Sequence, residues 1–188
     1  MIEVKILNSN IIGDVEKLFG CDKVTKDCWC MWFIIRVKDY HDNGSEGNHE
    51  LFMNMVQDSK DPVGILAYID GEPVGWCAVG PRKRYIRAIN TPTFKGRDPD
   101  EDASVWMIPC LYVRPDMRNK GVSRSLIERA IELAKENGAK AVESFPFSGT
   151  KKRTGGDTQV GVEPLFASCG FVVIRKPTNN RVVMRKDL

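Results

Sequence analysis

The residues best suited to chemistry lie in a short basic turn, residues 118–124, which reads Arg-Asn-Lys-Gly-Val-Ser-Arg. A helix-like pattern of apolar residues begins directly after it. A helix N-terminus carries unpaired backbone N–H groups and a partial positive charge, so it attracts phosphate. Gly121 has no side chain to keep a ligand away from the backbone. The turn therefore predicts a nest of backbone amides that holds a pyrophosphate, with an ordinary surface turn as the alternative.

Two predicted strands and a helix position this turn. Residues 105–113 form an apolar run that leads into it. From Val122 onward, apolar residues recur at a spacing that places them on one face of a helix, and Asn137-Gly138 ends that helix as a left-handed cap would. Residues 141–147 then supply the second strand. This order is typical of a right-handed crossover between parallel strands. The predicted buried face of the helix consists of Leu126, Ile127, Ala130, Ile131, Leu133 and Ala134.

This stretch resembles the acyl-CoA-binding motif of the GNAT superfamily of N-acetyltransferases. In that family, a strand ending in an apolar-x-Val pattern precedes Arg/Gln-x-x-Gly-x-Gly/Ala and a long helix. Residues 111–113 and 118–123 occupy those positions here, with Ser123 where the family usually has Gly or Ala. A Walker P-loop is excluded because the Gly-Lys-Ser/Thr ending is missing. The resemblance implies that acetyl-CoA is bound by Leu111, Tyr112, Val113, Arg118, Asn119, Lys120, Gly121, Val122, Ser123 and Arg124.

The rest of the chain follows the same family in order. Asp70-Gly71 stands between two apolar runs and predicts a β-hairpin over residues 63–79, which resembles the second and third strands of the GNAT fold. Residues 163–171 resemble the short GNAT helix that ends in Gly-Phe, and strands are predicted at 171–176 and 181–186. The resemblance implies one GNAT domain over residues 1–188, of the α+β or α/β class. Its central sheet is mixed and mostly antiparallel, is flanked by helices, and has a splayed parallel strand pair that holds acyl-CoA.

The N-terminal part is predicted from local patterns. Residues 1–7 alternate between apolar and charged side chains, which predicts a first strand. The apolar spacing over 10–19 and 50–59 predicts two helices. Residues 40–48 are predicted to form a polar loop, and both histidines of the chain, His41 and His49, are predicted to be solvated. The aromatic run at 27–35 is predicted to be buried core. One or two of Trp29, Met31 and Trp32 are expected to line the acceptor pocket.

Two charged or glycine-rich segments are predicted to be loops. Residues 80–102 are basic first and acidic last, which predicts solvated surface, with a cover over the acceptor site as the alternative. Residues 148–159 contain Lys151-Lys152-Arg153 and Gly155-Gly156 and are predicted to form a mobile, solvated loop. Closure over the substrate, or contact with the CoA phosphates, is the alternative for that second loop.

The resemblance also implies a mechanism, with two departures at catalytic positions. Phe166 stands where many members place a Tyr that protonates the leaving thiolate, and Met107 stands where some carry a basic Glu. Glu143 is the candidate catalytic base, since an acceptor amine must be neutral to attack; a structural carboxylate is the alternative. Lesser candidates are Asp102 and Glu163 as bases and Cys169 as a proton donor, the last with core packing as its alternative.

Composition excludes several classes of protein. Lys and Arg number 28 against 25 Asp and Glu, so the net charge of +3 does not by itself indicate nucleic-acid binding. No apolar run approaches the roughly 20 residues that span a bilayer, and the charged N-terminal stretch is no signal peptide. We therefore expect a cytoplasmic protein with six reduced cysteines. Cys28-x-Cys30 lacks the spacing of a zinc site, so no metal is expected.

The sequence thus predicts an acetyl-CoA-dependent N-acetyltransferase. It would transfer the acetyl group to a primary amine of a small molecule or peptide, by direct attack through a tetrahedral intermediate. The expected partners are acetyl-CoA and the amine, with a homodimer allowed for. A non-catalytic acyl-CoA-binding or regulatory module is the alternative. A nucleic-acid or protein adaptor that uses residues 82–87 and 151–153 is disfavoured, because a bound cofactor already accounts for the positive charge of the turn at 118–124.

Overall fold

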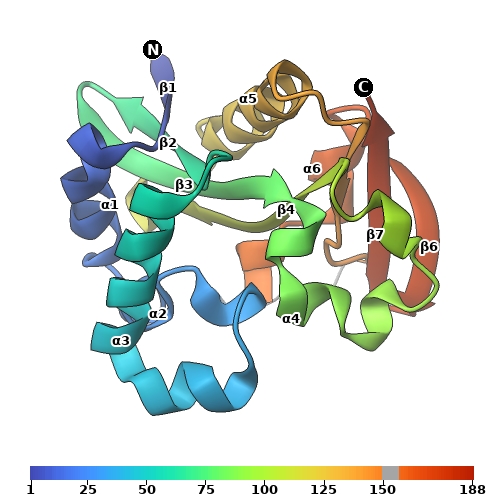
Figure 1. The fold of residues 1–188 in the computed structure, drawn as a ribbon. Helices are drawn as coiled ribbons and strands as arrows, with labels where there is room; N and C mark the ends of the chain where they lie inside the picture. Colours follow the sequence, from blue (N-terminus) through green and yellow to red (C-terminus); the bar gives the residue numbers. More distant parts are fainter. Residues whose placement is uncertain (150–156) are drawn as a thin grey trace.

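A computed structural model describes residues 1–149 and 157–188. Their seven strands form one sheet in the order β1-β2-β3-β4-β5-β7-β6 (Figure 1). Neighbouring strands are antiparallel except for β4 and β5, which are parallel. The predicted fold class is confirmed. The strands are β1 (Ile2–Ile6), β2 (Gly64–Ile69), β3 (Glu72–Pro81), β4 (Val105–Val113), β5 (Ala141–Ser144), β6 (Val172–Thr178) and β7 (Arg181–Asp187).

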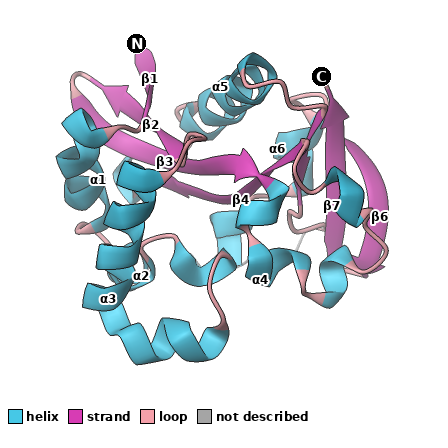
Figure 2. Cartoon of the chain, viewed as in Figure 1, coloured by secondary structure: helices cyan, strands magenta, loops and turns pink. Residues whose placement is uncertain are grey.

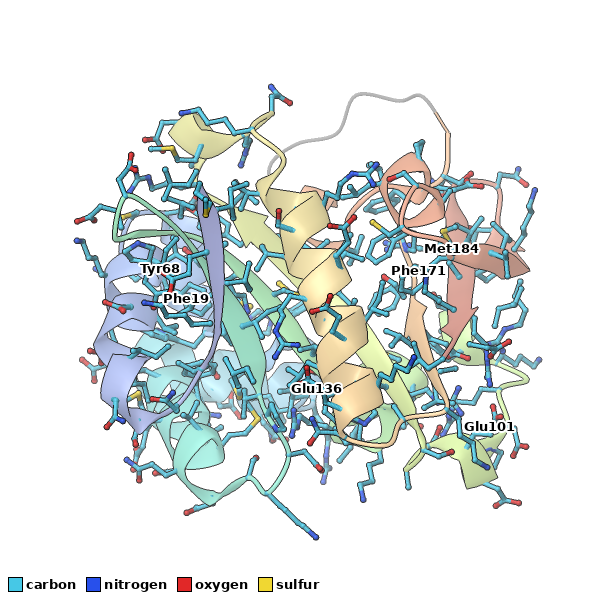
Figure 3. All side chains as sticks on the ribbon, turned by 90° about the horizontal axis from the view of Figure 1, so that it is seen from above. Phe19, Tyr68, Glu101, Glu136, Phe171 and Met184 are labelled. Carbon is cyan, nitrogen blue, oxygen red and sulfur yellow. The ribbon has the colours of Figure 1, made fainter. Side chains whose placement is uncertain are left out.

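Helices cover both faces of the sheet (Figure 2). One core cluster lies between α5 and the sheet, and a second lies between the N-terminal helices and the opposite face. Seen from above, α5 lies across the sheet, with Phe171 and Met184 on the side of β6 and β7 (Figure 3). The helices are α1 (Ile12–Phe19), α2 (Lys23–Cys28), α3 (Val37–Asp58), α4 (Ile86–Ile89), α5 (Val122–Glu136) and α6 (Glu163–Ala167). Among the described residues, no helix is both long and apolar enough to cross a membrane.

The local turn signals are confirmed. Asp70 and Gly71 both adopt positive φ, 52° and 80°, between β2 and β3, as a tight hairpin turn requires. Gly138 has φ 74° just after α5, and the Ala139 N–H donates to the Ala134 carbonyl, which closes the helix C-terminus. Both predictions succeeded because a short segment of backbone decides them.

The predicted polar loop at 40–48 is wrong. These residues belong to α3, which is continuous over Val37–Asp58 apart from a kink at Gly44 (φ 61°, ψ −165°). Asn48 is buried, and its side-chain amide donates to the carbonyls of Asp27 and Tyr40. The first half of α3 is mostly exposed, so it carries no apolar period for the sequence to show.

The prediction of solvated surface for residues 80–102 is also wrong in part. Arg82, Tyr85 and Phe94 are almost fully buried, and Phe94 belongs with Phe145 to a third core cluster. Arg82 anchors the segment, because its side chain bonds to Asp102, Glu143 and the Asp98 carbonyl. Most of the predicted loop at 148–159, including its Lys151-Lys152-Arg153 and Gly155-Gly156 sequences, lies outside the described residues.

We expect one of the six cysteines, Cys21, to react quickly with an aromatic disulfide reagent in the native protein. Cys21 is exposed, whereas the other five are buried. Burial raises the pKa of the Cys28 thiol to about 11 and that of Cys77 well above its usual range, so the reactive thiolate is scarce in both. The check is a thiol titration with and without urea, with Cys21→Ser as the control. Fast reaction of a second native thiol would contradict the packing described.

Candidate active site

The parallel strands β4 and β5 separate directly after their paired segment, towards their C-terminal ends. They pair only over Val105–Met107 and Ala141–Glu143. The Ser144 hydroxyl donates to the Ile108 carbonyl at 3.0 Å, at the point where the strands part. Among the described residues, no neighbouring strand pairs with residues 111–113 on the β5 side. The Val113 carbonyl accepts a hydrogen bond from Arg118 Nε at 3.3 Å, and the other backbone groups on that side are left to bond with a ligand or water.

A cavity of about 520 Å³ lies at this opening. It brings together the predicted cofactor-binding residues of β4, the turn and the start of α5, with the exception of Lys120, whose ammonium contacts the Met117 sulfur at 3.3 Å. Sequence reasoning missed the opposite wall, which comes from the segment around α6, far along the chain. The lining residues are Leu111, Tyr112, Val113, Met117, Arg118, Asn119, Gly121, Val122, Ser123, Arg124, Gln159, Gly161, Val162 and Leu165.

The basic turn has the backbone shape of an anion nest. Asn119 and Gly121 adopt left-handed φ values of 61° and 85°, on either side of Lys120. No side chain of the described residues caps α5, so the amides of its first turn are left unpaired by that part of the chain. Arg118 and Arg124 are exposed beside it. The arrangement suits a pyrophosphate, because amides and cations meet at one helix end.

A glycine on β3 lets this helix end approach the sheet. A Cβ atom on Gly75 would lie 2.8 Å from Val122 Cγ1 and 3.1 Å from Leu126 Cδ1, closer than side chains pack. The first turn of α5 therefore sits directly on the sheet, beside the edge of β4. This packing links the nest to the unpaired strand edge, so one extended ligand can contact both.

The predicted catalytic residues lie apart from the cavity lining. Glu143 is 1% exposed, and its carboxylate contacts Arg82 at 2.9 Å and Arg185 at 3.4 Å. Asp102 is paired with Arg82 and Arg97. These ion pairs favour a structural role for both carboxylates, so catalysis by Glu143 stays a prediction.

The other positions considered for catalysis also lie outside the cavity lining. Phe166 is buried and lies edge-on to Phe171, with ring centroids 5.2 Å apart. Met107 is buried in the third core cluster, and Cys169 is buried beneath α5 with a pKa raised by desolvation. Glu163 lies in the first turn of α6. None of the four lines the described cavity.

The sequence pattern predicted Tyr112 as part of the site but gave its side chain no role. The structure shows that this side chain is also a polar group of the site. Its hydroxyl is buried and has no hydrogen-bond partner among the described residues. Desolvation raises the pKa of this phenol. Tyr112 and Gln159 line both the large cavity and a small adjoining pocket beside Cys30, Trp76 and Cys110. The region below β4 is therefore mostly apolar and thiol-lined, and the Tyr112 hydroxyl is buried there near Thr25.

The fold and the sequence pattern were compared with those of known proteins. The Acetyltransferase (GNAT) family matches residues 29–152, more than half of the chain. No curated protein sequence matched. An N-acetyltransferase from Staphylococcus aureus Mu50 has a similar structure, with a TM-score of 0.59 and 13% identity, covering 100% of this chain and 98% of that one.

Two further similar structures were solved with a ligand. The paia N-acetyltransferase from Thermoplasma acidophilum, in complex with coenzyme A, has a TM-score of 0.56 and 14% identity, with coverage of 100% and 99%. The yncA protein from Salmonella typhimurium, with its cofactor acetyl-CoA, has a TM-score of 0.56 and 16% identity, with coverage of 100% and 94%. At these identities the likeness concerns the fold. Together with the family match over most of the chain, it establishes that this protein belongs to the acetyltransferase (GNAT) family of acetyl-CoA-dependent acyltransferases.

Proposed function

We propose that the protein transfers the acetyl group of acetyl-CoA to a primary amine of a small molecule or peptide. The observation that carries this proposal is the cavity at the β4–β5 opening, which joins an unpaired strand edge to an anion nest. An acyl-CoA has the matching parts in the same order: a thioester, an amide-bearing pantetheine arm and a pyrophosphate. The residues present therefore fit the co-substrate.

Each part of the cavity has a role in this proposal. Backbone groups of residues 111–113 bind the pantetheine amides, and the amides around Gly121 bind the pyrophosphate, assisted by Arg118 and Arg124. The thioester then lies deeper, near the point where Ser144 contacts the Ile108 carbonyl. A backbone N–H of β4 donates to the thioester oxygen and stabilises the negative charge that develops there.

The chemical step is a direct displacement. The lone pair of a neutral amine attacks the thioester carbon, a C–N bond forms, and a tetrahedral intermediate results. The C–S bond then breaks and CoA leaves as a thiolate, which takes a proton from solvent because Phe166 offers none. The amine loses its proton to a base or through a water chain, and Glu143 remains the predicted base.

Acetyl-CoA should stabilise the fold and be consumed with an amine. At a concentration of about a hundred times its dissociation constant, the ligand should raise the free energy of unfolding by about 2.7 kcal/mol. Thermal unfolding measures this effect, and release of the CoA thiol against a panel of amines measures turnover. The Cys21→Ser variant serves as the assay background, since it lacks the exposed thiol.

The three outcomes of this experiment differ in meaning. A thermal shift with thiol release supports the proposed reaction. A shift without release from any amine would favour a different acceptor group or the non-catalytic alternative. No shift at millimolar acetyl-CoA would contradict the assignment of the turn at Gly121.

A further inference from the structure

Arg87 is a half-buried cation that pairs with no acid in the part of the chain that the structure describes. It lies on α4, and its guanidinium carbon is 3.5 Å from the centroid of the Trp32 ring. Its Nη1 donates to the Trp32 carbonyl. Within residues 1–149 and 157–188, no Asp or Glu forms an ion pair with Arg87, whereas the buried Arg82 contacts both Asp102 and Glu143. A guanidinium partly removed from water without a carboxylate is suited to bind an anionic ligand.

An aromatic path leads from Arg87 to the point where β4 and β5 separate. Phe33, which follows Trp32 in the chain, packs edge-on against Phe145, with ring centroids 5.3 Å apart. Phe145 directly follows Ser144, whose hydroxyl marks that separation. Under the proposed function the amine attacks the thioester there. Arg87 therefore lies at the far end of a short aromatic surface, formed by Trp32 and Phe33, that is joined to the reaction centre through the buried Phe145.

A second guanidinium flanks the same aromatic path. Arg181 lies over the Phe147 ring, with its guanidinium carbon 3.7 Å from the centroid, and its Nη1 donates to the Phe145 carbonyl at 2.8 Å. Phe147 in turn pairs with Val162, which lines the cofactor cavity. A second guanidinium thus lies beside Phe145.

Three carboxylates near the point where β4 and β5 separate are already paired with arginines. Glu143 contacts Arg82 and Arg185, Asp102 contacts Arg82, and Glu101 contacts Arg185 at 2.9 Å. A second ammonium group on the acceptor, as in a diamine or polyamine, could not pair with these carboxylates, because arginines already bind them. An acceptor with a negative charge instead meets Arg87.

We propose that the acceptor is an amino acid or similar small amine that carries a carboxylate, and that Arg87 binds this carboxylate over the Trp32 ring. The side chain of the acceptor contacts the aromatic surface of Trp32 and Phe33, which are only partly buried. This assignment rests on the proposed function for the identity of the reaction. It makes Arg87 the residue that selects the acceptor class, outside the acetyl-CoA cavity.

The test compares amines that differ only in the carboxylate. Thiol release is measured with L-phenylalanine against 2-phenylethylamine and with L-leucine against isoamylamine, with spermidine as the polyamine. The amino acids should have at least a tenfold higher kcat/KM than their matched amines. Arg87→Gln should remove that advantage through KM, while the affinity for acetyl-CoA stays unchanged. Arg87→Lys should retain part of it.

Arg36→Gln is the matched control, because Arg36 is an exposed arginine that pairs only with Asp39 among the described residues. It should leave the preference intact. Equal rates for the matched amines, a preference for spermidine, or a preference that survives Arg87→Gln would overturn the proposal. Thermal unfolding of each variant establishes that it is folded.

A separate binding measurement covers the case of no turnover. Failure of every amine in the presence of bound acetyl-CoA would count against the proposed N-acetylation of such amines. Titration of N-acetyl-L-phenylalanine and N-(2-phenylethyl)acetamide into the CoA complex then tests the Arg87 site alone. Binding of the first, weakened about tenfold by Arg87→Gln, supports the site; equal or absent binding of both overturns it.

Discussion

Gly121→Val should lower the affinity for acetyl-CoA at least about a hundredfold, a loss of roughly 2.7 kcal/mol, while the protein stays folded. Gly121 has φ 85°, a conformation that costs a side-chain-bearing residue roughly 1–2 kcal/mol. Valine would shift the turn out of this conformation and move the amides away from the pyrophosphate. The fold itself should tolerate the change, because the nearest atom to a Cβ there is Ile2 Cδ1 at 3.9 Å.

The other end of the same helix offers a matched control. Gly138 has φ 74°, and a Cβ atom there would meet nothing within 4 Å. Gly138→Val therefore introduces the same kind of backbone strain, but far from the cavity. Both variants should lose roughly 1–2 kcal/mol of stability, and only Gly121→Val should lose affinity in a calorimetric titration. Unchanged binding by Gly121→Val would show that the turn does not hold the cofactor.

Arg82→Met should lower the free energy of unfolding by about 3–5 kcal/mol. Arg82 is 1% exposed and contacts Asp102 at 2.6 Å and Glu143 at 2.9 Å. Removing the guanidinium leaves the buried Glu143 carboxylate with Arg185 alone, at 3.4 Å. The cost is high because a charge taken out of water requires a close partner. The midpoint of urea denaturation measures the loss.

A surface arginine separates this effect from the general loss of an ion pair. Arg129 on α5 pairs with Glu132 and Glu136, both of which are largely exposed. Arg129→Met should cost less than about 1 kcal/mol, since exposed pairs are screened by water. Similar losses in the two variants would mean that the Arg82 network does not hold the β3–β4 connection in place. Such a result would also weaken the structural role assigned to the Glu143 carboxylate.

The sequence was most informative where neighbouring residues decide the structure. The hairpin at Asp70-Gly71 and the end of α5 at Gly138 depend on a few φ angles that the residue types reveal. The turn around Gly121 and the helix after it are also local, because the glycine and the 3.6-residue period lie in one stretch. This explains why one wall of the cavity was predicted almost residue by residue.

The tertiary structure decided which charges are buried and what faces them. Arg82 stands in a basic run that reads as surface, yet it is enclosed because Asp102 and Glu143, 20 and 61 residues away, supply compensating charge. The same contacts remove Glu143 from the cavity lining. The second cavity wall, from Gln159 to Leu165, has no local signal because it arises only when α6 packs beside β4. Sequence alone determined the glycine turn before α5 and the family fold, and long-range packing decided the partners of each charge.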